Sequence, residues 1–300
     1  MISKNKNKII VVCGPTATGK SDLAVVLAKK FDGEVISADS RQVYKGMDIG
    51  SGKITKTEMQ EVPHHLLDVI SPKKVFTVAD YQKLANEAIE KILAKNKLPI
   101  ICGGTGLYIQ SIVDDLILPE VPPDLGLRKE LKKKSVAELF IELKRLDPKR
   151  AENIDSKNPV RLIRAIEIAR TLGSVPKLQF GKNKKYEFLQ IGLTLDPEGL
   201  SEKIHARLLK RVKQGMIAEV ERLKDSGVSW KRLNDFGLEY RFVASFLQGR
   251  VSKDEMLEKL EVAIRQYAKR QITWFKRDEQ IKWFDPYNTG AILEYLDNVI

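Results

Sequence analysis

Cysteine is nearly absent from this 300-residue sequence: only Cys13 and Cys102 occur, each inside a short apolar run. Two such residues exclude a disulfide-stapled scaffold and a cysteine-rich metal site, and no zinc-finger spacing follows Trp274. No apolar run approaches the roughly 18 residues that suggest a membrane-spanning helix. The first run, Ile9–Cys13, is too short for the core of a signal peptide. We therefore expect no membrane association and a cytoplasmic location.

Hydrophobic residues make up 43% of the chain and charged residues 31%, which excludes a disordered or fibrous protein. The length allows one large domain or two smaller ones. Lys and Arg number 52 against 40 Asp and Glu, a net charge of +12. This excess suggests a polyanionic partner. A general contribution to solubility explains the net charge equally well.

The positive charge is concentrated in one fifth of the chain. Between Gly126 and Lys185 there are 17 Lys and Arg against 7 Asp and Glu, so this stretch carries ten of the twelve excess charges. Proline-rich residues 119–124 precede it. We expect residues 125–184 to form a helical insertion with a basic face, inside an α/β core built from residues 1–124 and 185–300.

Three helices are expected within the insertion. One covers Leu127–Lys134. A second begins at Ser135, where Glu138 three residues later indicates a capping box. The third follows Asn158, with Pro159 at its first helical position. Arginines alternate with apolar residues along this third helix.

Outside the insertion, short apolar runs alternate with helical segments. This order is typical of a parallel sheet covered by helices on both faces, an α/β fold. Capping boxes are expected at Thr77 with Asp80 and at Ser252 with Glu255. The expected strands are Ile9–Cys13, Glu34–Ala38, Leu98–Cys102 and Phe188–Leu195. The expected helices are Ser21–Phe31, Thr77–Lys95, Thr105–Val113, Pro197–Ser226, Glu239–Gln248 and Ser252–Asp278.

A phosphate-binding loop follows the first expected strand, because residues 14–21 fit G-x-x-x-x-G-K-[S/T] between a strand and a helix. In such a loop backbone N–H groups surround an oligophosphate, and the helix N-terminus adds partial positive charge. Lys20 adds a full charge, and the Ser21 hydroxyl is placed to bind Mg²⁺. The candidate diphosphate-binding residues are Gly14, Pro15, Thr16, Ala17, Thr18, Gly19, Lys20 and Ser21. The pattern does not say whether the ligand is a nucleotide.

Two further strand ends carry residues that suit a ligand-binding site. Asp39 follows the second strand, and Gly103, Gly104 and Thr105 follow the third. Because the carboxyl ends of parallel strands form the ligand crevice, we expect these loops to converge on the phosphate loop. Asp39 could act there as a general base, although a turn-forming aspartate is the commoner role. The glycines would let the backbone approach a ligand, and Thr105 could simply cap a helix.

Five motifs occur in one order along the chain: the phosphate loop, Ser37–Lys53, His64–Asp68, Gly103–Tyr108 and Tyr267–Trp274. Together they resemble the tRNA dimethylallyltransferase (tRNA isopentenyltransferase) family over nearly the whole chain. The resemblance implies a P-loop NTPase-like sheet whose phosphate loop holds dimethylallyl diphosphate with Mg²⁺. It implies transfer of the dimethylallyl group to the exocyclic N6 amine of the adenosine 3′-adjacent to the anticodon in tRNA, with release of diphosphate. We expect a monomer.

The resemblance also assigns roles to single residues. Asp39 matches the family's general base on the adenine amine, Thr105 a hydroxyl that positions the reacting groups, and Arg207 an arginine that neutralises the leaving diphosphate. The residues that match tRNA-contacting positions are Asp39, Ser40, Arg41, Gln42, Thr105, Val160, Arg161, Leu162, Ile163 and Arg164. Val160 stands where many relatives have a polar or basic residue, and Arg211 stands where Met is common.

Two other functions share some of these features. A P-loop kinase of a small metabolite would have the same first loop but does not need the basic insertion. An RNA-binding NTPase switch would want an aspartate at the end of the third strand, where this chain has glycines. We expect structural roles for His64 and His65 and for both cysteines, and core positions for Tyr267, Trp274 and Trp283.

Overall fold

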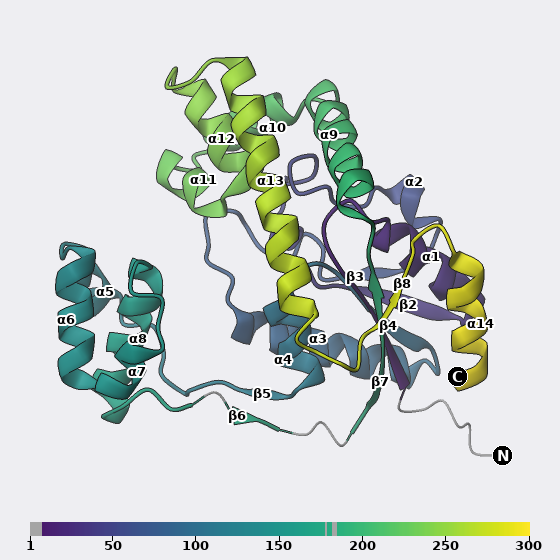
Figure 1. Ribbon diagram of the computed structural model, residues 1–300, viewed down its shortest axis with the longest axis horizontal. Coiled ribbons are helices and arrows are strands. Elements are labelled where there is room, and N and C mark those ends of the chain that lie inside the picture. Colours follow the sequence, from purple (N-terminus) through teal and green to yellow (C-terminus); the bar gives the residue numbers. More distant parts are fainter. Residues whose placement is uncertain (1–7, 178, 182–184) are drawn as a thin grey trace. The chain divides into compact units, whose positions relative to one another are not determined.

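The computed structural model describes residues 8–177, 179–181 and 185–300 (Figure 1). The chain forms two compact units: a core unit, Met1–Asp114 with Asn183–Ile300, and an insertion unit, Asp115–Lys182. The insertion unit therefore begins at Asp115 rather than at residue 125. It does so because β5 (Leu116–Ile117) pairs antiparallel with β6 (Gln179–Phe180). Within the described residues, no helix is both long and apolar enough to cross a bilayer.

A six-stranded sheet in the order β3-β2-β4-β1-β7-β8 forms the centre of the core unit, and all its pairings are parallel. The four longer strands are almost entirely buried, as expected for continuous apolar runs in a parallel sheet. The strands are β1 (Lys8–Cys13), β2 (Gly33–Ser37), β3 (His64–His65), β4 (Leu98–Cys102), β7 (Glu187–Leu193) and β8 (Lys282–Phe284). The predicted α/β fold with a parallel sheet is confirmed.

Helices cover both faces of this sheet. On one face α3 (Val78–Ala94) and α4 (Gly106–Val113) bury their apolar sides. On the other face α1 (Lys20–Lys30) packs with α14 (Thr289–Val299), and Figure 1 shows these two helices side by side. The predicted capping box of Thr77 and Asp80 is present at the start of α3. A short helix, α2 (Lys56–Met59), follows the β2 loop.

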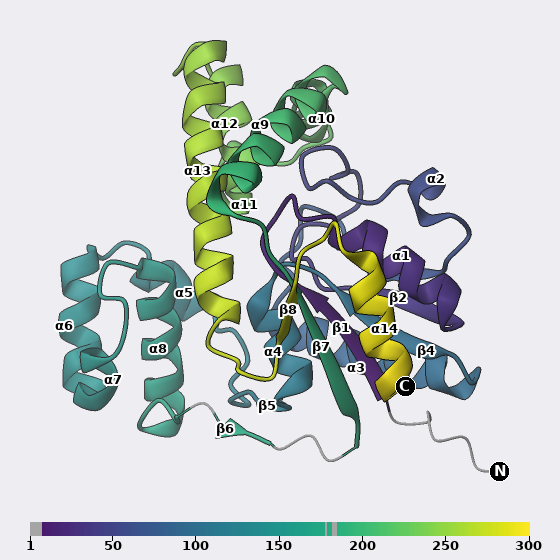
Figure 2. The same cartoon turned by 45° about the vertical axis from the view of Figure 1, so that its right-hand side comes forward.

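A helical subassembly follows β7, which leads directly into its first helix (Figure 2). Its apolar core also receives Val43, Tyr44 and Met47 from the loop after β2. The predicted single helix Pro197–Ser226 is wrong: it is broken at Gly215, whose φ of 99° is left-handed. The predicted capping box at Ser252 is only half formed, because Ser252 accepts from the Glu255 N–H without a return bond. The helices are α9 (Pro197–Lys213), α10 (Met216–Asp225), α11 (Trp230–Phe236), α12 (Leu238–Leu247) and α13 (Lys253–Phe275).

The insertion unit is helical, as predicted, and has its own apolar core. Ser135 and Glu138 form the predicted capping box, and Asn158 caps the last helix with Pro159 at its first position. Its helices are α5 (Leu125–Leu131), α6 (Val136–Leu146), α7 (Pro148–Glu152) and α8 (Pro159–Leu172). Sequence reasoning missed α2, α7 and α11 and the strands β3, β5, β6 and β8, since such short elements carry little periodicity. It also missed α14, although that helix has 11 residues.

Candidate active site

The carboxyl ends of three neighbouring strands lie in register at one edge of the sheet. Cys102 pairs with Val12 on one side and with Ser37 on the other. The hydrogen bond from the Thr105 N–H to the Ala38 carbonyl, 3.1 Å, continues this alignment into the loops. The phosphate loop, Asp39 and Thr105 therefore emerge together, which is the predicted convergence.

The phosphate loop turns tightly from β1 into α1. Gly14 has a φ of 133°, and a Cβ there would lie 2.4 Å from the Leu193 carbonyl oxygen, so only glycine fits. The Thr18 hydroxyl is buried and donates to the Pro15 carbonyl at 2.9 Å. Gly14, Pro15 and Thr18 thus shape the loop, while Thr16–Ser21 line a cavity in front of it.

Two cations at this cavity are poorly solvated. Burial lowers the pKa of Lys20 to about 8. Burial, followed by the neighbouring Arg211 guanidinium, lowers the pKa of Arg207 to about 9. Among the described residues neither cation has a carboxylate partner; Lys20 donates to the Pro15 carbonyl and Arg207 to the Thr16 hydroxyl. Desolvated cations that are not paired directly with a carboxylate favour an anionic ligand, because such a ligand restores the lost interactions.

Asp39 lies between the loops. Its Oδ1 accepts from the N–H groups of Arg41, at 2.7 Å, and Gln42, at 3.3 Å. Every hydrogen bond that the described residues make to this side chain goes to Oδ1, so Oδ2 remains for a ligand. The Thr105 hydroxyl does not cap its own helix but accepts from the Ser40 N–H at 3.0 Å. This bond joins the loop after β4 to the loop that carries Asp39.

Gln271 of α13 holds the two glycine-rich loops together. Its Oε1 accepts from the Thr16 N–H at 2.9 Å, and its Nε2 donates to the Gly104 carbonyl at 2.8 Å. A Cβ at Gly104 would lie 2.3 Å from Nε2, and one at Gly103 would lie 2.2 Å from the Ala38 carbonyl oxygen. These glycines are therefore required for packing. Both also line the phosphate-loop cavity, so a close approach of a ligand to their backbone stays a prediction. Sequence reasoning gave Gln271 no role.

Two adjoining cavities open onto these groups. The first, of 390 Å³, lies over the phosphate loop. The second, of 280 Å³, includes Phe236, Arg241 and Arg270 in its wall. Both cavities are lined by Thr16, Asp39, Ser51, Arg207 and Tyr267. A ligand in one cavity thus meets a ligand in the other beside Asp39 and Arg207.

Tyr267 was expected in the apolar core, but it lines both cavities. It lies one helical turn before Gln271 on α13, so both side chains face the same way. Burial, followed by the charge of Asp39, raises the pKa of Tyr267. Both residues belong to the Tyr267–Trp274 motif. Their i, i+4 spacing was the sequence signal that could have identified them as site residues.

Several residues keep the structural roles expected of them. Cys13 and Cys102 are buried strand residues, and burial raises the pKa of each thiol to about 12. His65 contacts the Glu34 carboxylate at 2.7 Å on the edge of the sheet. Trp274 and Trp283 pack against the apolar core between the sheet and helices α3 and α4. No group of three or more His, Cys, Asp or Glu side chains suited to a metal occurs in the part of the chain described.

The predicted tRNA-contacting residues of the core unit have intramolecular partners. Arg41 donates through Nε to the Phe236 carbonyl at 2.7 Å and still lines the second cavity. The Gln42 side chain donates to the Gly52 carbonyl at 3.2 Å. Ser40 reaches Thr105 through its backbone N–H.

In the insertion unit, residues 160–164, which were predicted to contact tRNA, differ in how exposed their side chains are. Leu162 and Ile163 lie in the apolar core, so their side chains are not available to a ligand. Val160 is 75% exposed, and the Arg161 side chain is 63% exposed. Arg164 is held by the Val121 carbonyl and the Glu167 carboxylate.

Comparison with known proteins shows similarity over nearly the whole length. The profile described as IPP transferase matches residues 42–278. The chain is 45% identical to tRNA dimethylallyltransferase 2 of Treponema denticola, covering 92% of this chain and 94% of that protein. It is 41% identical to a tRNA dimethylallyltransferase of Acaryochloris marina, covering 95% and 94%.

Solved structures agree with these matches. The crystal structure of full-length tRNA isopentenylpyrophosphate transferase from Bacillus halodurans superposes with a TM-score of 0.74, at 37% identity, over 97% of this chain and 96% of that one. A eukaryotic dimethylallyltransferase, crystallised while acting on tRNA, superposes with a TM-score of 0.76 over 93% of this chain and 74% of that one. At 23% identity this second likeness concerns the fold alone.

Proposed function

The chain belongs to the IPP transferase family and is an enzyme that prenylates adenosine in tRNA, and we propose that its donor is dimethylallyl diphosphate. We propose further that the acceptor is the N6 amine of the adenosine immediately 3′ of the anticodon. The observation that carries this proposal is the meeting of two cavities at Asp39 and Arg207. A transferase needs such a place, where donor and acceptor lie against each other with a base and a cation.

The phosphate-loop cavity suits the diphosphate end of the donor. Lys20, Arg207 and the loop N–H groups would stabilise the negative charge that grows on the leaving diphosphate. The Ser21 hydroxyl and the carboxylate of Asp22 line the same cavity, and hydroxyl, carboxylate and phosphate oxygens are the ligands that Mg²⁺ prefers. Ser21 would hold the ion, which supplies further charge stabilisation to the diphosphate.

In this proposal Asp39 removes a proton from the acceptor. The adenine amine is a weak nucleophile because its lone pair is delocalised into the ring. As nitrogen bonds to C1 of the dimethylallyl group, the C1–O bond to diphosphate breaks and one N6 proton passes to the Asp39 carboxylate. General-base assistance of this kind contributes typically about 10²–10⁴-fold. The Ser40–Thr105 hydrogen bond fixes the loop that presents this carboxylate.

The second cavity suits a nucleotide. Phe236 and Tyr267 offer aromatic surface for stacking, while Arg41, Arg241 and Arg270 offer charge for the adjoining phosphates. A base modified by this route must leave its stack. Loop nucleotides are already partly unstacked, so an anticodon-loop adenosine lowers this cost.

The insertion unit is the proposed surface for the rest of the tRNA. Most of the excess positive charge of the chain lies in its region of the sequence, and Val160 and Arg161 expose their side chains at the start of α8. Phosphate contacts from such a surface would add affinity that depends on salt.

The test is a product assay. Purified protein, dimethylallyl diphosphate, Mg²⁺ and unmodified tRNA are incubated, and the digested nucleosides are analysed by mass spectrometry. We expect dimethylallyladenosine at one position of the anticodon loop. A parallel assay follows ATP hydrolysis. Rapid ATP turnover without prenylated product would contradict the proposal and favour a kinase or an NTPase switch.

A further inference from the structure

Residues 39–53, which we call the wall segment, form one side of both cavities. The segment contains no helix and no strand. It contributes Gln42 and Gly52 to the first cavity, Arg41 and Gly50 to the second, and Asp39 to both. An isolated parallel bridge between Tyr44 and Ile70 and several turn hydrogen bonds hold part of its backbone. The rest of its shape depends on side chains that bind its backbone.

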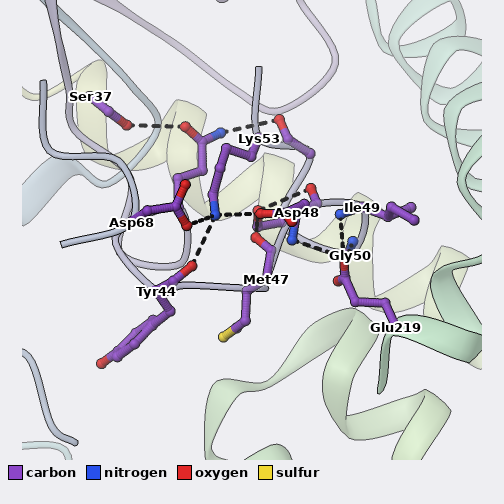
Figure 3. Close-up of polar contacts among 12 residues, drawn as sticks. Ser37, Tyr44, Met47, Asp48, Ile49, Gly50, Lys53, Asp68 and Glu219 are labelled. Carbon is purple, nitrogen blue, oxygen red and sulfur yellow. Dashed lines mark hydrogen bonds and ion pairs between the residues drawn. The ribbon is translucent and has the colours of Figure 1, made fainter. Parts of the chain in front are cut away.

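Glu219 of α10 binds three successive N–H groups of the wall segment (Figure 3). Its Oε2 accepts from Asp48 at 2.8 Å and from Ile49 at 2.6 Å, and its Oε1 accepts from Gly50 at 3.0 Å. The Tyr240 hydroxyl donates to the same Oε1 at 3.0 Å. Glu219 is only 2% exposed. A buried carboxylate with four donors is well satisfied, and without it three adjacent N–H groups lose their partner.

Arg211 connects the wall segment to Arg207. The Gly50 carbonyl accepts from Arg211 at 3.3 Å, and Arg211 pairs with Glu239 at 2.9 Å. A Cβ at Gly52 would lie 1.7 Å from the Arg211 guanidinium, so the backbone here packs directly on that side chain. Arg211 follows Arg207 by one turn of α9, and its charge is one cause of the lowered pKa of Arg207. A shift of the segment would therefore move the charges around the diphosphate cavity.

Other contacts of the segment run both to distant elements and within the loop region; Val43, Tyr44 and Met47, for example, pack in the helical core. The Lys53 ammonium contacts the Tyr44 carbonyl at 2.9 Å, Asp48 at 2.6 Å and Asp68 at 2.5 Å (Figure 3). These contacts close the loop on itself. Glu219 of α10 and Arg211 of α9 join the backbone of the loop to the helices, and Glu219 binds three of its N–H groups.

We propose that Glu219 is a positioning residue for the transfer reaction, which holds the wall segment so that Gly52 and Arg207 enclose the diphosphate of the donor, with Arg211 of the second cavity bound to the same segment. The identity of the ligand rests on the proposed function. The carboxylate itself touches no substrate in this arrangement; it acts through the three N–H groups that it binds.

The experiment compares Glu219→Gln with Glu34→Gln. The amide keeps the size of the side chain but turns one acceptor into a donor that faces N–H groups. Glu34 is a matched control, since it is equally buried, is bound by His65 and Lys95, and lines neither cavity. Calorimetry measures binding of inorganic diphosphate without tRNA, and steady-state kinetics give KM for dimethylallyl diphosphate and for tRNA. Circular dichroism follows thermal unfolding of both variants.

We expect Glu219→Gln to weaken diphosphate binding and raise KM for the donor by about tenfold or more. KM for tRNA should rise as well, because Gly50, which Glu219 binds, lines the second cavity. Glu34→Gln should lower the melting temperature without altering diphosphate affinity. Wild-type diphosphate affinity in folded Glu219→Gln, or an equal loss in the control, would overturn the proposal.

A milder variant covers the case in which Glu219→Gln does not fold. Tyr240→Phe removes one of the four donors and keeps the ring, and it should weaken diphosphate binding about two- to fivefold. Unchanged affinity there would also overturn the proposal. The calorimetry needs neither tRNA nor turnover, so an absence of prenylated product contradicts the proposed function without deciding the role of Glu219.

Discussion

The Ser40 N–H donates to the Thr105 hydroxyl oxygen at 3.0 Å, across 65 residues of sequence. This bond links the loops after two adjacent strands, β2 and β4. It leaves Thr105 next to Asp39, whose Oδ1 is occupied by the N–H groups of its own turn. The aspartate is thus held by one oxygen, and the other is left for a ligand.

We predict that Asp39→Asn lowers kcat by roughly 10²-fold or more, because the amide can keep the turn but cannot take a proton. Affinity for tRNA, measured by filter binding, should change far less. The control is Asp48→Asn, in the same segment but outside both cavities. A collapse of tRNA affinity with kcat retained at saturating tRNA would make Asp39 a binding residue instead.

The lowered pKa of Lys20 predicts a pH dependence. Lys20 is charged below about pH 8 and loses its proton as pH rises through that value. Diphosphate affinity should therefore fall above pH 8 in the wild type. Lys20→Arg should retain affinity to higher pH, since a guanidinium holds its proton more tightly than an ammonium in the same site. Calorimetric titrations from pH 7 to about 9.5 provide the comparison, because ionisation of diphosphate itself affects both proteins alike.

The same titrations apply to Lys20→Ala, which we expect to lose measurable diphosphate binding at every pH. Parallel curves for wild type and Lys20→Arg would show that the proton on Lys20 does not control the affinity.

Gln271→Leu should impair both stability and catalysis. The change leaves the Thr16 N–H and the Gly104 carbonyl without their partner, at a cost of about 1–3 kcal/mol for each buried group. Gln190→Leu is a suitable control, since Gln190 is also buried and binds Asp278 away from both cavities. The melting temperature should be lower than that of the wild type in both variants, and kcat/KM should fall only for Gln271→Leu. Unchanged kcat/KM there would limit Gln271 to a structural role.

Two of the three arginines of α8, Arg161 and Arg164, should affect the salt dependence of tRNA binding differently. Arg161 is exposed and lies 3.8 Å from the exposed Asp155, a weak pair. Arg161→Gln should flatten the log–log salt dependence of tRNA binding by about one unit if it contacts phosphate. Arg164→Gln should instead lower the melting temperature, because Arg164 is one of two arginines bound to the buried Glu167. A reduced slope for Arg164→Gln alone would reverse this assignment.

Local patterns were sufficient for the elements that build the sheet. The buried runs of β1 and β4, the phosphate loop and the capping residues of α3 and α6 all follow from short-range sequence signals. The break at Gly215 was harder, because a glycine inside a helical pattern can be tolerated or can end the helix. Only the packing of α10 against α9 and α12 decides between these outcomes.

The amino-acid sequence by itself determined the kind of chemistry: an anion-binding loop, a carboxylate at the next strand end and a basic insertion, because these depend on residue type and near neighbours. Tertiary structure decided which partners those residues keep. It placed Gln271 between two loops more than 160 residues away, drew Leu162 and Ile163 into a core, and set Glu219 behind the wall segment. Such contacts join residues distant in the chain and depend on burial and hydrogen-bond direction, which no local pattern encodes.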